Sequence, residues 1–214
     1  MISRKQLRQH LELLLNSGIK EIEKSGVDRK EKLQELAIQY AQCSKCDLSQ
    51  GRTNLVYGEG NPFAKVMIIG EAPGQQEDLK GRPFIGRAGE LLTKMLAAIQ
   101  IQRDEVYITN IAKCRPPANR EPTIAERAAC LPYLIQQIQI IQPQMFIFLG
   151  LVSAQFLLNT NASLGELRKE VQTFMDRPAY VIYHPAALLR NEHLKRPAWE
   201  DLQRFQKHYQ SLNT

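Results

Sequence analysis

Four apolar runs of this sequence are each followed, where the run stops, by residues that could do chemistry. The runs 65–69, 105–109, 145–149 and 179–183 lead into Gly70-Glu71, Asn110, Gly150 and His184-Pro185. Short apolar runs that stop at Gly or Pro are typical of buried strands. In a parallel sheet the carboxyl ends of the strands share one edge, where ligands bind. We therefore expect the Glu71 carboxylate, the Asn110 amide and the His184 imidazole to face one crevice.

Each of these residues has a simpler explanation when it is taken alone. A histidine after a strand is more often a structural hydrogen bonder than a catalyst, and Asn110 could cap a turn. Their co-location is harder to explain in this way, because it joins an acceptor, a mixed donor and acceptor, and a proton-carrying ring. Ser153 lies in the turn before a predicted helix, whose N-terminus could meet a phosphate.

Other kinds of catalytic site are missing from the sequence. It contains no G-x-S-x-G nucleophile elbow, no G-x-x-x-x-G-K-[ST] phosphate loop and no G-x-G-x-x-G fingerprint. Its histidines are His10, His184, His193 and His208, too scattered for the cluster of a metal hydrolase. A nucleotidase or esterase on the same sheet would need such a cluster or such an elbow. The crevice is therefore expected to act by orientation and electrostatics.

The four cysteines form a candidate metal site. Cys43 and Cys46 make a C-x-x-C knuckle, Cys114 follows the second predicted strand, and Cys130 lies in the next predicted helix. A Cys43–Cys46 disulfide is not expected in a reducing compartment. Zinc ribbons usually supply two C-x-x-C pairs, which the second pair here does not match, and four thiolates also suit an iron–sulfur cluster. The spacing alone leaves iron–sulfur, zinc and no metal open.

The elements that position these residues alternate along the chain. Helical periodicity predicts helices near 87–101, 123–141, 152–159 and 198–211, and a further strand is expected at 170–174. Thr123 and Glu126 offer a capping box at the start of the second of these helices. Repeated strand–helix units predict an α/β fold, a three-layer sandwich with a central, mostly parallel four-stranded sheet flanked by helices.

The first 41 residues are predicted to form a helical extension, and 42–214 the main domain. Apolar residues recur at helical spacing over 2–24, Gly26 breaks the pattern, and a second helix is expected over about 29–41. The extension either packs on the main domain or is a solvated helical hairpin without a role.

Composition bounds the class of protein. The chain has 214 residues, a formal charge of +6 and 43% hydrophobic residues, an ordinary globular balance. Its apolar stretches are too short to span a bilayer, and no signal peptide is recognised, so we expect a cytoplasmic protein without a membrane partner. A sequence pI of about 9.2 makes nucleic acid a candidate partner, although it also fits a soluble protein that happens to be basic. A monomer is the default expectation.

Taken together, these motifs resemble those of the family 4 uracil-DNA glycosylases, the iron–sulfur branch of the uracil-DNA glycosylase superfamily. The matching segments are GEAPGQQED (70–78), GRPFIGRAGELL (81–92), YITNIAKCRPP (107–117) and HPAALLR (184–190), together with the four cysteines. The resemblance covers about residues 40 to 210. It implies the superfamily fold, a short parallel sheet between helices.

The resemblance also implies an activity, which is hydrolysis of the N-glycosidic bond of deoxyuridine in DNA. This reaction releases uracil and leaves an abasic site, as in base excision repair of DNA damage. The implied partner is DNA containing uracil, single- or double-stranded. The implied cofactor is a structural [4Fe–4S] cluster on the four cysteines. The alternative is a non-catalytic or differently specific DNA-binding member of the same superfamily.

Through the matching positions, the resemblance implies a role for each residue that meets the base. Phe84 would stack on the extruded uracil, and Asn110 would tell uracil from cytosine. His184 would donate to uracil O2 as negative charge builds there. Glu77 would line the pocket near C5 of the base, where it could help to reject thymine.

The remaining implied contacts concern the water, the sugar and the DNA backbone. Glu71 and the backbone near Ala72 would position the water or the sugar, Gly74 belongs to the same loop, and Leu188 would fill the gap left by the flipped nucleotide. Other branches of the superfamily have Asp or Asn where this chain has Ala72, so Glu71 is our choice for the water-activating residue. Basic residues around the mouth could hold phosphates. They are Lys80, Arg82, Arg87, Lys113, Arg115, Arg190, Lys195 and Arg196.

Overall fold

The computed structural model describes residues 29–211 of the chain. The helix expected over 2–24 lies outside the described residues, so the extent of the predicted extension 1–41 stays a prediction. The strands are β1 (Glu59–Gly60), β2 (Val66–Gly70), β3 (Tyr107–Asn110), β4 (Met145–Leu149), β5 (Gln172–Phe174) and β6 (Arg177–Ile182). They form one sheet in the order β1-β3-β2-β4-β6-β5.

The centre of the sheet is parallel, as predicted. Strands β3, β2, β4 and β6 pair in parallel, whereas β1 and β5 pair antiparallel at the two edges. The expected four-stranded sheet is therefore the core of a six-stranded mixed sheet. β1 has only two residues, too few for an apolar pattern in the sequence to reveal it.

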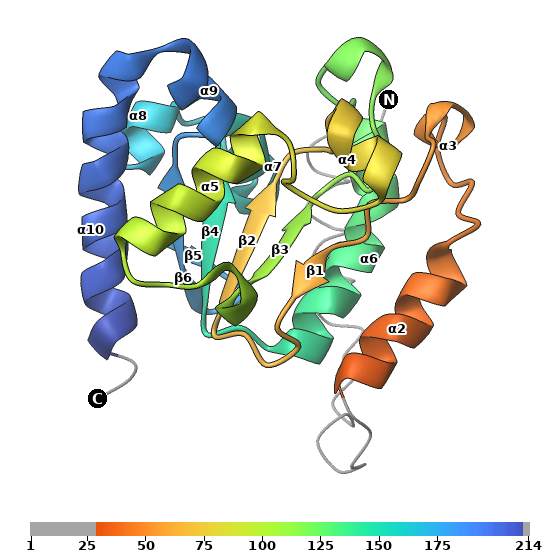
Figure 1. Cartoon of the computed structure of the whole chain (residues 1–214), viewed down its shortest axis with the longest axis horizontal. Helices are drawn as coiled ribbons and strands as arrows, with labels where there is room; N and C mark the ends of the chain where they lie inside the picture. Colours follow the sequence, from red (N-terminus) through yellow and green to blue (C-terminus); the bar gives the residue numbers. More distant parts are fainter. Residues whose placement is uncertain (1–28, 212–214) are drawn as a thin grey trace.

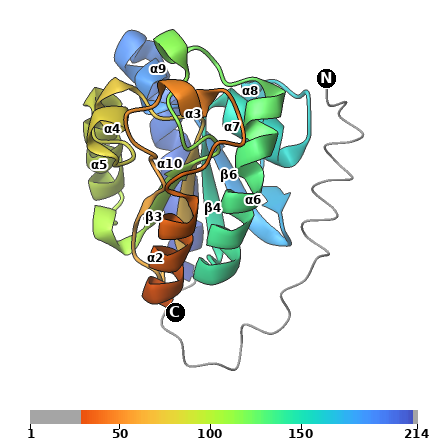
Figure 2. The same cartoon turned by 90° about the vertical axis from the view of Figure 1, so that its right-hand side faces the viewer.

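Helices cover both faces of the sheet, which confirms the three-layer architecture (Figures 1 and 2). One face carries α5 (Arg87–Ala98) and α10 (Lys195–Ser211), and the other carries α6 (Ile124–Ile141) and α7 (Leu151–Leu158). The shorter helices are α3 (Leu48–Gly51), α4 (Gln75–Lys80), α8 (Leu164–Leu167) and α9 (Pro185–Arg190), with 3-10 turns η2 (Arg103–Glu105), η3 (Pro117–Asn119) and η4 (Glu192–Leu194).

The alternation of side chains along β2 shows why both faces need cover. Met67 and Ile69 belong to the core beneath α6 and α7, whereas Val66 and Ile68 belong to the core beneath α5 and α10. All four side chains are buried, with at most 1% of their surface exposed. A central strand buried on both faces gives a continuous apolar run rather than an alternating one.

Most element boundaries follow the sequence patterns. The capping box of α6 is confirmed, because the Thr123 hydroxyl accepts from the Glu126 N–H while the Glu126 carboxylate accepts from the Thr123 N–H. Strand β3 starts two residues later than expected, because residues 103–105 form the turn η2. Helices α4 and α9, of six residues each, lie where the sequence analysis predicts no helix. None of the helices formed by residues 29–211 is both long and apolar enough to cross a membrane.

The described part of the predicted extension packs on the domain. Helix α2 (Arg29–Tyr40) lies beside α6 in Figure 2, and the Arg29 guanidinium donates to the Ile141 carbonyl at 2.9 Å. The Tyr40 ring packs against that of Tyr133 on α6, with 3.8 Å between the ring centroids and the ring planes tilted by 36°. This helix is therefore part of the packed domain rather than a solvated appendage.

The register brings the chemistry-bearing strand ends to one edge. Gly70 at the end of β2 pairs with Asn110 at the end of β3. Leu149 at the end of β4 pairs with Ile182 at the end of β6, two residues before His184. Parallel pairing across four strands thus places the four predicted strand ends side by side.

Candidate active site

A cavity of about 440 Å³ lies at the carboxyl ends of the parallel strands. Eight of the predicted site residues line it, namely Glu71, Ala72, Gly74, Glu77, Phe84, Asn110, His184 and Arg190. The co-location expected from the strand ends is therefore present. The volume is within the range of small-molecule sites.

Phe84 and Asn110, which both line the cavity, meet beside Gly70. A Cβ atom on Gly70 would lie 2.4 Å from Asn110 Oδ1 and 2.6 Å from Phe84 Cζ, so only glycine leaves room for both side chains there. Asn110 is 1% exposed, and its Oδ1 has no hydrogen-bond partner within residues 29–211. A buried acceptor without a partner costs free energy, so a ligand N–H that reached it would be favoured.

The backbone around Phe84 is held by Glu77. The Glu77 Oε1 atom accepts hydrogen bonds from the N–H groups of Ile85 and Gly86, at 3.0 and 2.9 Å. Phe84 itself has a φ of 49°, the left-handed region that is unusual for a bulky side chain. The carboxylate of Glu77 therefore has a structural task, which is to fix the loop that presents the Phe84 ring at the start of α5.

His184 caps helix α9 and is held as a neutral ring. The Ala186 N–H donates to His184 Nδ1 at 3.1 Å, so Nδ1 is the acceptor and the ring proton resides on Nε2. Burial, assisted by the charge of Arg190, lowers the pKa of His184 to about 4. Its ring centroid is 5.6 Å from that of Phe84. At neutral pH the histidine thus offers an uncharged N–H donor beside the aromatic ring.

Glu71 supplies the carboxylate of the cavity. Burial raises the pKa of Glu71 above its ordinary value; the nearby Glu121 carboxylate adds to this rise, and Arg127 opposes it. A carboxylate with a raised pKa is a stronger base than a solvated one. Its backbone is fixed, since the Glu71 carbonyl accepts from the Ala112 N–H at 3.0 Å.

Two predicted contacts lie away from the cavity. Ser153 is fully buried, and its hydroxyl donates to the Leu149 carbonyl at 2.8 Å one turn earlier, so it does not offer itself to a phosphate. Leu188 is 3% exposed and packs in the core formed with α5 and α10. Its neighbour Leu189 is 41% exposed instead. Sequence alone could not separate these two leucines, because the six-residue helix α9 decides which of them faces inward.

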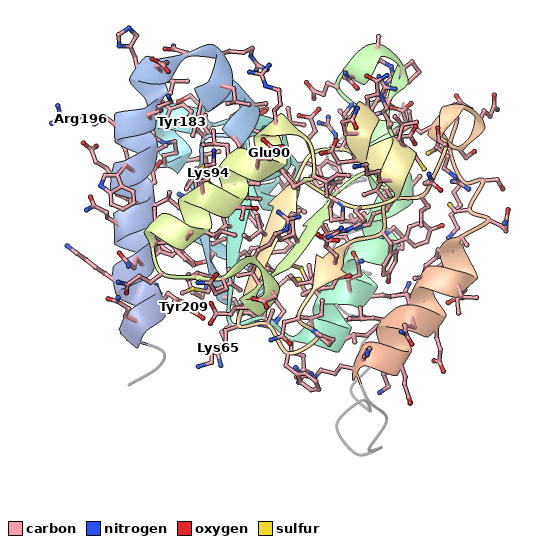
Figure 3. The ribbon with its side chains drawn as sticks, viewed as in Figure 1. Lys65, Glu90, Lys94, Tyr183, Arg196 and Tyr209 are labelled. Atoms are coloured by element: carbon pink, nitrogen blue, oxygen red, sulfur yellow. The ribbon has the colours of Figure 1, made fainter. Side chains whose placement is uncertain are left out.

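The predicted phosphate contacts differ widely in exposure. Lys113 is fully buried and cannot reach DNA from that position; its ammonium group is bonded within the domain, and burial lowers its pKa to about 7. Arg82 pairs with Glu59 at 2.7 Å, and Arg196 points away from α10, 3.4 Å from Glu200 (Figure 3). Arg190 is exposed and lines the cavity.

Other lining residues were not predicted. They come from the loop after Cys114 (Pro116, Asn119 and Arg120), from the turn after β4 (Leu149, Gly150, Leu151 and Val152), and from Pro73, Ala88 and Ala186. Arg120 is held by the Glu126 carboxylate through two hydrogen bonds of 2.7 and 2.8 Å. The capping box at Glu126 was visible in the sequence, but nothing there indicated that the same carboxylate would also hold an arginine at the cavity.

The four cysteines come from the segment before α3, from the segment after β3 and from helix α6. All four are free, and the thiols of Cys46 and Cys130 are hydrogen-bonded to each other, which lowers the pKa of Cys46 and raises that of Cys130. Arg52 donates to Cys114 Sγ at 3.3 Å and to the Cys43 carbonyl at 2.7 Å. Residues 29–211 contain no three His, Cys, Asp or Glu side chains grouped to hold one metal ion.

The chain shares sequence similarity with known proteins over most of its length. The family model of the uracil DNA glycosylase superfamily matches residues 57–203. A type-4 uracil-DNA glycosylase of Pyrobaculum aerophilum is 46% identical over 181 residues, which cover 81% of this chain and 92% of that protein. Type-4 uracil-DNA glycosylases of Archaeoglobus fulgidus and Thermotoga maritima are 42% and 39% identical, over 82% of this chain and 92% and 94% of their own lengths.

Proposed function

The chain belongs to the uracil DNA glycosylase superfamily, with type-4 enzymes among its relatives, and from this membership we propose that it removes uracil from DNA. The proposed reaction is hydrolysis of the N-glycosidic bond of deoxyuridine, which leaves an abasic site. One observation supports it above all: Glu71, Phe84, Asn110 and His184, from four separate segments, line a single cavity.

Recognition of uracil is assigned to Asn110 and Phe84. The Asn110 Oδ1 atom has no partner within residues 29–211 and can accept a hydrogen bond from uracil N3–H. Cytosine has no hydrogen at N3 and would leave this acceptor unsatisfied. Such a buried mismatch costs on the order of 1–3 kcal/mol. Stacking of the base on Phe84 contributes roughly 1–3 kcal/mol and is insensitive to base identity. Selectivity therefore rests on the amide and affinity largely on the ring.

Bond cleavage is assigned to His184 and Glu71. When the bond between C1′ and N1 breaks, its electron pair leaves with uracil, and negative charge collects on O2. The neutral His184 Nε2–H can donate to that oxygen, and a donor of this kind is worth roughly 3–4 kcal/mol. Glu71 accepts a proton from the water whose oxygen bonds to C1′. The uracil anion takes up one proton and Glu71 gives one up, both through solvent. The products are therefore an abasic sugar and neutral uracil, and the cavity residues are regenerated.

Extrusion of the base requires a filler for the gap, and we assign this to Leu189. Leu189 is exposed and directly precedes Arg190, which lines the cavity, whereas Leu188 is committed to the core. Flipping a base out of a duplex costs a few kcal/mol, which an inserted apolar side chain and phosphate contacts offset.

The cysteines are proposed to hold a [4Fe–4S] cluster with a structural role. The donor set fits, because four free thiols come from three segments of the chain. Three of them, Cys43, Cys46 and Cys114, interact with the Arg52 guanidinium, which can balance the negative charge of a thiolate-ligated cluster. In such a cluster each thiolate binds its own iron, so the sulfurs need not converge on one point. The cluster would tie the knuckle 43–46 to the segment after β3 and to α6.

DNA containing uracil is the proposed partner, and we further propose that the protein works as a cytoplasmic monomer. Four free cysteines and a thiolate-bound cluster suit a reducing compartment. Size-exclusion chromatography with light scattering would give a mass near 24.5 kDa for a monomer.

The proposed activity is tested with labelled oligonucleotides that carry one uracil, thymine or cytosine, in single- and double-stranded form. We expect alkali-sensitive abasic sites in the uracil substrates alone. Binding of the uracil oligonucleotides without base release would favour the non-catalytic alternative, and removal of another base would favour a differently specific member of the superfamily.

A further inference from the structure

Lys113 is a fully buried cation inside the domain, between the cysteines and the cavity. Its side chain is completely shielded from solvent. The Lys113 Nζ atom donates to Thr109 Oγ1 at 2.6 Å, to the Asn110 carbonyl at 2.8 Å and to Gln137 Oε1 at 2.7 Å. An ammonium group has three hydrogens, and these three acceptors use all of them. Burial of a charged group costs free energy, which these three hydrogen bonds offset. A lysine is rarely placed in the core, so we asked what this one does there.

The acceptors of Lys113 belong to a wider buried network. Gln137 on α6 also donates to the Tyr57 carbonyl at 2.9 Å and to the Tyr107 hydroxyl at 3.1 Å. The Thr109 hydroxyl donates to the same Tyr57 carbonyl. Helix α6 and strand β3, which lie in different layers, are thereby joined to one another through a single ammonium group (Figure 2). A buried network whose polar groups are hydrogen-bonded in this way is rigid.

The backbone of Lys113 reaches the cysteines. Its N–H donates to the Cys130 thiol, and its carbonyl accepts from the Val56 N–H at 2.8 Å. Two residues earlier, the Ile111 N–H donates to the carbonyl of Gly70, which lies beside the cavity residues Asn110 and Phe84. The segment 110–114 therefore begins at the cavity with Asn110 and ends at the cysteine site with Cys114. Lys113 bonds to the Asn110 carbonyl through its side chain and to the Cys130 thiol through its backbone.

We propose that Lys113 is a positioning residue for uracil recognition, which holds the Asn110 backbone so that its amide stays fixed in the cavity. This inference rests on the proposed function. The Lys113 ammonium group donates to the Asn110 carbonyl. The Asn110 side chain lines the cavity, and its Oδ1 has no hydrogen-bond partner within residues 29–211. Loss of the hydrogen bond from Lys113 leaves the Asn110 carbonyl and its peptide plane free to rotate. The amide then loses its fixed direction, and discrimination of uracil from cytosine falls.

Binding to uncleavable DNA tests the proposal without relying on catalysis. Single-stranded oligonucleotides with one 2′-fluoro-2′-deoxyuridine or one 2′-fluoro-2′-deoxycytidine resist hydrolysis, so the ratio of their Kd values reports how the pyrimidine edge is read. The variant Lys113→Met keeps an unbranched side chain but removes all three donors. Ile138→Ala truncates a buried core side chain next to Gln137 in the sequence of α6 and is the control for a general loss of stability.

We expect Lys113→Met to reduce the preference for uracil about tenfold or more, with unchanged iron content and circular dichroism, while Ile138→Ala keeps the wild-type preference. A folded Lys113→Met protein with the wild-type ratio would overturn the proposal, and so would an equal change in the Ile138→Ala control. If Lys113→Met does not fold, Thr109→Val, which removes one acceptor of the lysine, is judged by the same ratio, with a smaller reduction expected. Uracil release by the wild-type protein is measured in parallel, so failure of the proposed activity is seen separately.

Discussion

At the scale of single residues, the account depends on a buried amide. We expect Asn110→Asp to slow uracil release by about tenfold or more and to make release of cytosine detectable, because a protonated Asp can donate to cytosine N3 where the amide oxygen of Asn110 cannot. Single-turnover rates on uracil and cytosine oligonucleotides measure both effects. An unchanged rate ratio in a folded variant would remove Asn110 from base selection.

The ionisable groups of the cavity predict a pH profile. The neutral form of Glu71 cannot take a proton from water, so the rate falls as pH drops through its raised pKa. His184 becomes charged only near pH 4, so it does not shape the profile above about pH 5. We expect Glu71→Gln to lose this acid limb together with most of the activity. His184→Ala should be slower by a hundredfold or more and keep the limb. An acid limb that survives in Glu71→Gln, or that is lost in His184→Ala, would contradict these roles.

Two adjacent leucines offer a matched pair of variants. Leu189→Ala removes an exposed side chain, so we expect weaker activity on duplex than on single-stranded uracil DNA with little change in thermal stability. Leu188→Ala empties part of a packed core and should lower stability by about 2–5 kcal/mol. Thermal denaturation and the ratio of duplex to single-strand rates separate the two. If Leu188→Ala alone lowers that ratio, the filler is Leu188.

At the scale of elements, helix α6 carries both the cap and the fourth cysteine. Thr123→Ala deletes the hydroxyl that accepts from the Glu126 N–H, and we expect a loss of about 1 kcal/mol in the free energy of unfolding. Chemical denaturation measures this loss. Thr123→Ser keeps the hydroxyl and serves as the control; equal stability of both variants would show that the cap contributes nothing.

The elements that the sequence predicted well are those with long periodic patterns. Strands β2 and β4 and helices α5 and α6 follow from apolar runs or helical spacing. Helices α4 and α9 and strand β1 are too short for a pattern, so only tertiary contacts define them. The side chains of Ser153 and Lys113 illustrate a second limit. Both are polar and were expected at the surface, yet each is buried because backbone carbonyls or neutral side chains satisfy its donors. Such partners come from other turns, strands or layers and leave no local signal.

At the scale of the whole molecule, the cysteines connect three segments of the fold. Cys130→Ala removes one ligand of the proposed cluster, so we expect loss of iron, of brown colour and of several degrees in Tm. Tyr133→Phe is the control, because it deletes only the hydroxyl bonded to Cys43 Sγ at 2.8 Å and keeps all four thiols. An iron-free wild-type protein that is folded and active would contradict the cluster and leave zinc or no metal.

The cavity and the cysteine site are joined by one short segment of the chain. Strand β3 ends in Asn110 at the cavity, and four residues later the chain reaches Cys114. Anything that fixes the segment 110–114 therefore stabilises the recognition amide and the cysteine site together. The buried network around Lys113 gives this connection a physical basis.

The most direct test of the central claim is a structure of the protein with free uracil bound. We predict one uracil in the cavity of about 440 Å³, stacked on Phe84, with N3–H donating to Asn110 Oδ1 and O2 accepting from His184 Nε2. Uracil bound elsewhere, or in the cavity with its edge turned away from Asn110 and His184, would contradict the account.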